Sequence, residues 1–155
     1  MNLINWNASA NVSTPLPEIT TPELLAALNE LLEAERAGAR VARETAATWP
    51  EDDPWREVVL EIQSDELRWC RLLMDLIHRM NAKPSALTGA FHAKAMGIPD
   101  QIERMRFLNR GQAWVVRRLE VLLAHRLEPQ VREGLKAMRD AHAGQIERVT
   151  HHLST

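Results

Sequence analysis

Residues 62–73, IQSDELRWCRLL, place an acidic residue on the apolar face of a predicted helix. Apolar residues recur around this stretch at intervals of three and four, which is the spacing of one face of an α-helix. Glu66 lies on that face, four residues after Ile62 and three before Trp69. A carboxylate in a protein interior is costly unless it is paired, protonated or bound to a metal. The function of this chain therefore depends on which group meets Glu66.

The composition excludes several classes of partner. The chain has 155 residues with 19 basic and 21 acidic side chains, and its net charge is −2. This balance gives no indication of a nucleic-acid partner, and no apolar run is long enough to span a membrane. Cys70 is the only cysteine, which rules out an internal disulfide and is typical of a reducing compartment. The N-terminal residues lack the basic and apolar regions of a secretory signal, so we expect a cytoplasmic protein.

The chain is expected to divide into an arm and one domain. Residues 1–19 have no periodicity and are rich in Asn, Ser, Thr and Pro, which favours an extended arm lying on the surface or reaching a neighbouring subunit. Trp6 is its expected anchor, and we expect a homodimer. Residues 20–155 carry helical periodicity throughout and are long enough to form a single bundle domain.

The periodicity predicts four long helices. They are expected over residues 22–47, 54–81, 100–127 and 128–153. The short turn between the first two makes them antiparallel neighbours. The connection over residues 82–99, with a short helix near 91–96, is long enough to travel the length of a ~40 Å helix. The second and third long helices can therefore run parallel, with an up-down-up-down arrangement as the alternative.

Each long helix carries a polar residue on its inward face, about twelve or thirteen positions from its start. These residues are Glu35, Glu66, Gln112 and His142, and Asn109 lies on the same face of the third helix. Because the helices have similar lengths, the four positions lie near mid-height whichever way each helix runs. Carboxylates and an imidazole that converge inside a bundle form the donor set of a metal site.

Three stretches, LLEAERAGARV, SDELRWC and LNRGQAWVVRR, resemble the ferritin-like superfamily and in particular an uncharacterised group of small bacterial ferritin-like proteins. The resemblance implies an all-α, ferritin-like four-helix bundle with a long connection between helices 2 and 3. In the well-studied relatives, helices 1 and 3 each give a glutamate and helices 2 and 4 each give a Glu-x-x-His pair. Together these residues bind two metal ions that react with oxygen or peroxide.

Only part of that motif is present in this chain. By position, Glu35 matches the ligand of helix 1 and Glu66 matches the glutamate of helix 2. Trp69 stands where the histidine of helix 2 is expected, and Gln112 replaces the glutamate of helix 3. The two-metal set is therefore incomplete, and the motif is degenerate.

Helix 4 departs from the motif as well. Arg139, three residues before His142, replaces the acid of the Glu-x-x-His pair. If the register is shifted, His142 takes the place of the acid and Gln145 that of the histidine. In either register, His142 is the residue of this helix that can bind a metal.

The leading hypothesis is a metal-dependent oxidoreductase. We expect Glu35, Glu66 and His142 to hold one ion, iron or manganese before zinc, with open positions for oxygen, peroxide or water. The side chains expected to surround these ligands are Asp65, Trp69, Asn109 and Gln112. The residues predict no particular small-molecule ligand.

A metal-free bundle is the alternative hypothesis. Glu35 and Glu66 would then share a proton, with the pKa of one raised by the other and by burial. Asn109, Gln112 and His142 would complete a hydrogen-bonded network that fixes the register of the helices. Such a protein would act as a binding or assembly module rather than as a metalloenzyme.

Overall fold

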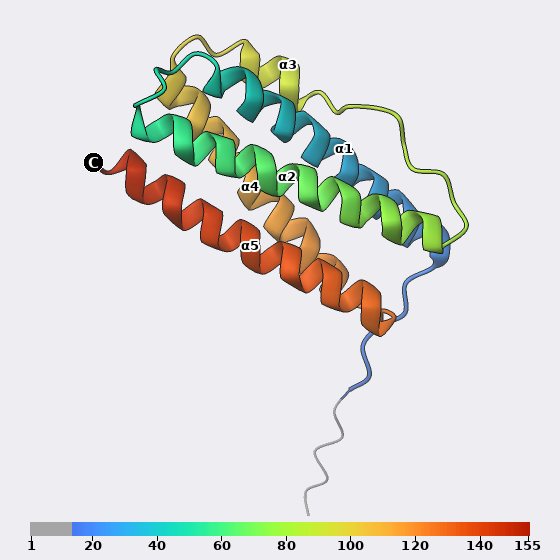
Figure 1. The fold of residues 1–155 in the computed structure, drawn as a ribbon. Coiled ribbons are helices and arrows are strands. Elements are labelled where there is room, and N and C mark those ends of the chain that lie inside the picture. The colour runs from blue at the N-terminus through green and yellow to red at the C-terminus, as the bar shows by residue number, and fades with distance from the viewer. Residues whose placement is uncertain (1–13) are drawn as a thin grey trace, which may run out of the picture.

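The computed structural model describes residues 14–155, and over this range the chain is helical with no strand (Figure 1). Its helices are α1 (Thr21–Ala46), α2 (Pro54–Arg79), α3 (Phe91–Met96), α4 (Gln101–Leu123) and α5 (Pro129–Leu153). The predicted all-α class is confirmed. Trp6 lies outside the described residues. None of the helices within residues 14–155 combines the length and apolar character that a membrane crossing requires.

Short polar side chains mark where three of the long helices, α1, α2 and α4, begin. The Thr20 side chain accepts a hydrogen bond from the backbone of Glu23, and the Glu23 carboxylate accepts one from the backbone of Thr20. This capping box satisfies N–H groups that have no partner within α1. Asp53 and Asp100 cap α2 and α4 without the reciprocal bond, each with a side-chain oxygen 2.8 Å from a backbone nitrogen.

Helix α4 ends at Leu123, about one turn earlier than predicted from the sequence. The backbone beyond it finds partners outside the helix. The Arg126 N–H donates to the carbonyl of Pro17 over 2.9 Å, and the Arg132 guanidinium donates to the carbonyls of Leu123 and His125. Because these groups are satisfied elsewhere, the helix gains little by continuing.

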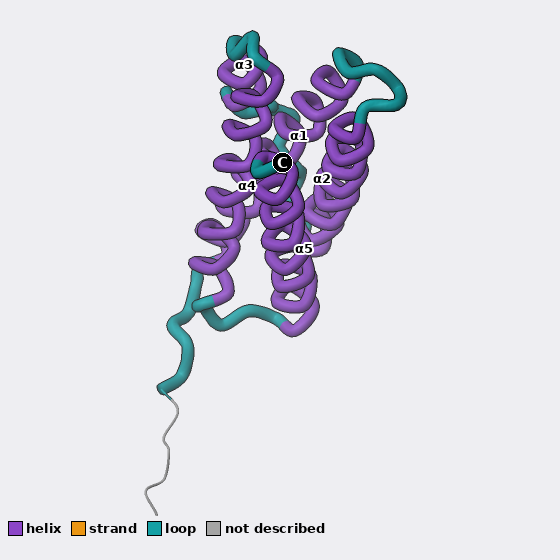
Figure 2. Tube along the Cα trace, turned by 90° about the vertical axis from the view of Figure 1, so that its left-hand side faces the viewer, coloured by secondary structure: helices purple, strands orange, loops and turns teal. Residues whose placement is uncertain are grey.

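Contacts between helix ends establish the directions of the long helices. Gln101 at the start of α4 donates to the carbonyl of Thr48, just after the end of α1. Arg148 near the end of α5 pairs with Glu61 near the start of α2 over 2.7 Å. Helix α1 is therefore antiparallel to α2 and α4, and α5 is antiparallel to α2. It follows that α2 and α4 run in the same direction, as both views show (Figures 1 and 2).

The connection between α2 and α4 travels back along α1 and carries α3 (Figure 1). Asn29 and Glu33 hold its first part by accepting hydrogen bonds from the backbone and hydroxyl of Ser85. Arg36 donates to the carbonyls of Ser85 and Leu87. One face of α1 therefore fixes the path of this long connection.

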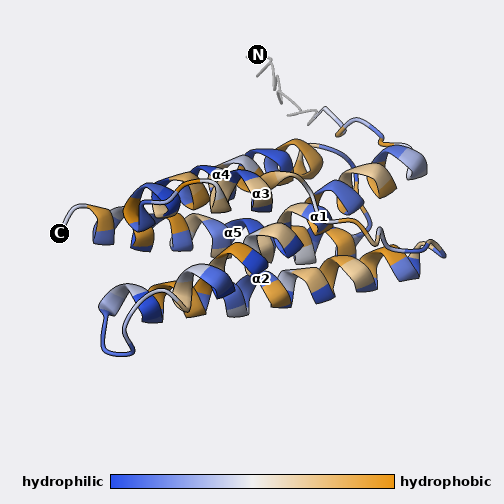
Figure 3. Cartoon of the chain, turned by 90° about the horizontal axis from the view of Figure 1, so that it is seen from above, coloured by the Kyte–Doolittle hydropathy of each residue, from blue (hydrophilic) through white to orange (hydrophobic). Residues whose placement is uncertain are grey.

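The interior contains two separate apolar clusters along the length of the long helices. The first cluster, toward the start of α1, includes Leu28, Leu31, Leu32, Trp69, Leu73, Val115, Leu119, Leu135 and Met138. The second cluster, toward the end of α1, includes Val41, Ala42, Val59, Ile62, Met105, Leu108 and Val149. Figure 3 shows hydrophobic and hydrophilic residues alternating along each long helix. Both clusters stabilise the fold by removing apolar surface from water.

Candidate functional site

A layer of buried polar side chains separates the two apolar clusters. We call it the polar layer; it consists of Glu35, Glu66, Gln112, His142 and Gln145, each no more than 5% exposed. On every long helix these residues lie between members of the first cluster and members of the second. The polar side chains therefore occupy one level of the interior, and the apolar clusters close this level off on both sides.

Glu35 and His142 form a buried pair across α1 and α5. His142 Nε2 lies 3.1 Å from Glu35 Oε1, and His142 Nδ1 lies 3.0 Å from the carbonyl oxygen of Met138. A carbonyl only accepts, so Nδ1 carries a proton. The pair then holds one further proton between Nε2 and Oε1. Burial lowers the pKa of His142, but the charge and hydrogen bond of Glu35 outweigh this effect, and the pKa is raised overall.

Glu66 extends from α2 toward the backbone of α1. Burial raises its pKa well above the usual range, and the charges of Glu35 and Asp65 add to this effect, so Glu66 favours the protonated carboxyl. The space for this carboxyl exists because residue 38 is glycine. A Cβ atom at Gly38 would lie 2.7 Å from Glu66 Oε2 and closer still to Oε1.

Gly38→Ala is expected to displace the Glu66 carboxyl and destabilise the protein, whereas Gly144→Ala is expected to stabilise it by about 0.5–1 kcal/mol. Both glycines lie inside helices, but a Cβ atom at Gly144 meets nothing within 4 Å. Urea denaturation of the two variants checks this expectation. Equal gains in stability would show that Gly38 does not accommodate Glu66.

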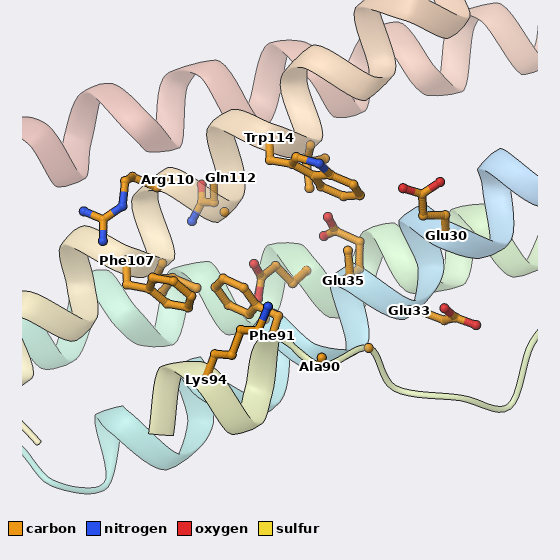
Figure 4. Close-up of a pocket in the computed structure, with 17 residues that line it drawn as sticks. Glu30, Glu33, Glu35, Ala90, Phe91, Lys94, Phe107, Arg110, Gln112 and Trp114 are labelled. Atoms are coloured by element: carbon orange, nitrogen blue, oxygen red, sulfur yellow. The ribbon is translucent and has the colours of Figure 1, made fainter. Parts of the chain in front are cut away.

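A pocket of about 520 Å³ opens onto the polar layer between α1, α3 and α4 (Figure 4). We call it the large pocket. It is lined by Glu30, Glu33, Ala34, Glu35, Gly38, Glu66, Gly89, Ala90, Phe91, Lys94, Phe107, Leu108, Arg110, Gly111, Gln112, Trp114 and Val115. Within residues 14–155, Oε2 of Glu35, Oε2 of Glu66 and both polar side-chain atoms of Gln112 are buried without a hydrogen-bond partner. These three side chains form the floor of the pocket.

A second, much smaller cavity lies between α2, α4 and α5. Its volume of about 10 Å³ is close to the minimum for one water molecule. It is lined by Ile62, Asp65, Glu66, Trp69, Gln112, Ala141, His142 and Gln145. Asp65 accepts a hydrogen bond from Gln145 over 3.3 Å, and the ring of Trp69 lies 6.5 Å from that of His142. Glu66 and Gln112 therefore separate the small cavity from the large pocket.

The sequence pattern of a family described as a domain of unknown function, DUF6306, matches residues 22–151. The chain belongs to the DUF6306 family. Comparisons with curated proteins and with solved structures gave no match. The matched range begins in the first turn of α1 and ends in the last turn of α5. The DUF6306 domain therefore includes the whole polar layer and both cavities.

The DUF6306 fold brings together most of the residues singled out from the sequence. Glu35, Glu66, Gln112 and His142 share the polar layer, and Asp65 and Trp69 line the small cavity beside them. Asn109 is placed elsewhere, because it donates to the Thr150 hydroxyl over 3.2 Å and lines neither cavity. At three residues before Gln112, it is rotated by ~60° around the helix axis.

The residues of this DUF6306 domain do not form the three-ligand metal site expected from the sequence. Among residues 14–155, no three His, Cys, Asp or Glu side chains lie close enough together to hold one ion. Both ring nitrogens of His142 are engaged, by Glu35 and by the Met138 carbonyl. The Glu66 carboxyl is turned toward Gly38.

The aromatic wall of the DUF6306 pocket is not apparent from the inward stripes of the long helices. Phe91 comes from the connection and stacks on Phe107 of α4, with ring centroids 4.8 Å apart. The ring of Phe91 occupies the space beside Gly111, where a Cβ atom would lie 2.9 Å from Cζ. Glycines within otherwise regular helices, at positions 38 and 111, were the available signal for close packing at this site.

Proposed function

We propose that this DUF6306 protein binds a small molecule in the large pocket. The observation that carries the proposal is the set of buried, unpartnered polar atoms on Glu35, Glu66 and Gln112, three side chains that line a pocket of about 520 Å³. A buried polar atom without a hydrogen bond costs about 1–3 kcal/mol, so such atoms mark places where a ligand supplies partners. The volume is within the range of ligand pockets, about 300–1,000 Å³.

We further propose that the fold is a ferritin-like four-helix bundle adapted to this purpose. The direction of α2 and α4, and the long connection that joins them along α1, support this assignment (Figure 1). In the metal-binding relatives that the sequence resembles, carboxylates and histidines of the interior serve as ligands. Here Glu35 and His142 are paired with each other, which favours the metal-free binding module over the metal-dependent oxidoreductase.

The buried pair has a positioning role in the proposed function. Because His142 binds one oxygen of Glu35, the other oxygen is held toward the interior without a partner. Gln112 presents one donor group and one acceptor at the same level. The floor of the large pocket is therefore preorganised to exchange hydrogen bonds with a ligand.

Binding of the neutral fluorescent probe N-phenyl-1-naphthylamine tests the proposal. We expect saturable binding of one probe molecule per chain and loss of binding in Gly89→Trp. Gly89 lines the large pocket and has nothing within 4 Å of an added Cβ atom, so the tryptophan obstructs the pocket without displacing the backbone. Gly144→Trp is the matched control, because Gly144 has equal space but lies outside the pocket.

The probe measurement is repeated with a chelator and with added Fe²⁺, Mn²⁺ or Zn²⁺. No effect of chelator or metal is expected. Equal binding by wild type and Gly89→Trp would place the probe elsewhere and contradict the proposal. One metal ion bound per chain, lost in both Glu35→Gln and Glu66→Gln, would restore the metal-binding hypothesis.

A further inference from the structure

We infer that the large pocket is built for an aromatic carboxylate. Lys94 and Arg110 at the rim hold the carboxylate, the ring lies along the aromatic wall, and an N–H or O–H group at the other end of the molecule reaches Gln112. This inference rests on the proposed function, since it names the ligand class of the same pocket. Its separate support comes from the charges of the rim, the shape of the walls and the hydrogen-bonding capacity of the floor.

The free charge at the rim is positive. Lys94 and Arg110 are exposed and form no ion pair with any residue of the described part of the chain. Of the two acidic residues of the rim, only Glu30 forms an ion pair within residues 14–155. Glu30 pairs with Arg118 over 2.7 Å, and Glu33 accepts a hydrogen bond from the Ser85 hydroxyl. The Ser85 hydroxyl does not neutralise Glu33, so the described rim holds two unpaired cations, Lys94 and Arg110, and one unpaired anion.

Figure 4 shows how these charges are arranged. Lys94 and Arg110 lie near the Phe91 and Phe107 rings, whereas Glu30 and Glu33 lie toward the opposite end of the pocket. The Arg110 guanidinium is 5.7 Å from the centroid of the Phe107 ring. A guanidinium that stacks on a ring still directs its N–H groups outward, where they can bind a carboxylate in a fork-like geometry.

The walls favour a planar apolar body. Phe91 and Phe107 are nearly parallel, with an angle of 9° between their planes. The indole of Trp114 lines the same pocket, and the Arg118 guanidinium lies 5.7 Å from the centroid of the Trp114 rings. Aromatic side chains contribute large contact areas and prefer offset-stacked or edge-to-face neighbours. A flat ring meets both requirements better than a branched aliphatic chain does.

The floor is suited to a neutral polar group. Glu35 Oε2 and Gln112 Oε1 accept hydrogen bonds, and Gln112 Nε2 donates them. These oxygens would repel a carboxylate, whereas a ring N–H or a hydroxyl group would donate a hydrogen bond to them. The charge of Glu35 is already met by His142, so a cationic ligand is not required there. The anionic end of the ligand therefore points to the rim and the neutral end to the floor.

Three molecules that share an indole ring test the inference by calorimetry and by displacement of N-phenyl-1-naphthylamine at neutral pH. Indole-3-acetate is an anion, indole-3-acetamide is neutral and tryptamine is a cation. We expect indole-3-acetate to bind at least tenfold more tightly than the amide, and tryptamine to bind most weakly. All three offer the same ring N–H to the floor, so the order reports the charge that the rim prefers.

Substitutions at the rim identify the groups that carry this preference. Lys94→Met and Arg110→Met are each expected to weaken indole-3-acetate binding about tenfold, a typical loss for a charge-assisted hydrogen bond, and to leave indole-3-acetamide nearly unchanged. Arg117→Met is the matched control, because Arg117 is an exposed arginine of α4 that does not line the pocket. All three side chains are exposed, so the variants are expected to fold normally.

Failure of this inference is distinguishable from failure of the proposed function. Suppose that N-phenyl-1-naphthylamine binds, but that tryptamine displaces it best or that none of the three indoles displaces it. The assignment of an aromatic carboxylate as the ligand is then overturned, while the proposal that the pocket binds a small molecule still stands. Equal losses in Arg110→Met and Arg117→Met also overturn the inference, because only general charge would then matter. Absence of probe binding in wild type overturns both proposals together.

Discussion

His142→Leu is expected to lower the free energy of unfolding by about 3–5 kcal/mol, because it leaves Glu35 buried without the group that shares its proton. Glu35 is only 1% exposed, and its second carboxylate oxygen has no hydrogen-bond partner among residues 14–155. The imidazole is therefore the polar group that compensates this carboxyl. Guanidinium denaturation at neutral pH measures the loss.

The double variant Glu35→Met, His142→Leu is the control for this prediction. It replaces both partners by apolar side chains of similar volume, and such replacements of buried pairs are often neutral or stabilising. Most of the stability lost in His142→Leu should therefore return. A double variant as unstable as the sum of the two single variants would show that the residues do not interact, because independent effects add.

Glu66→Gln is expected to make the protein more stable than wild type by an amount that grows as the pH rises. Burial and neighbouring charges raise the folded pKa of Glu66 above its usual value of 4.5. The protonated Glu66 carboxyl therefore contributes its full stability below the pKa that this residue has in the unfolded chain. That contribution is lost as the pH rises through the pKa that the residue has in the folded protein. The loss is about 1.4 kcal/mol per pH unit within this window, and glutamine, which does not ionise, avoids it.

Denaturation of both proteins at pH 5 and pH 8, with and without a chelator, measures the difference. The raised pKa of His142 also reduces stability as the pH rises above 6.5, but it does so in both proteins and largely cancels. A difference independent of pH would contradict the assignment of a proton to Glu66. A chelator that destabilises only wild type would indicate a metal ligand instead.

The positions of the long helices, and the faces that they bury, could be predicted from the sequence alone. Intervals of three and four residues, together with capping residues such as Thr20 and Asp53, are properties of neighbouring residues along the chain. For the same reason the burial of Glu35, Glu66, Gln112 and His142 was predictable, since each lies on an apolar stripe. Because these four residues lie at similar numbers of positions after the starts of their helices, the sequence also indicated that they share one level of the interior.

The partner of each polar side chain, in contrast, depends on how the helices pack against one another. The rotation of each helix about its axis directs His142 toward Glu35 and turns Asn109 toward Thr150. The path of the connection brings Phe91 to Gly111 and so creates the aromatic wall of the pocket. These arrangements depend on packing between residues that are far apart in the sequence. Helical periodicity describes one helix at a time, so it carries no information about such packing.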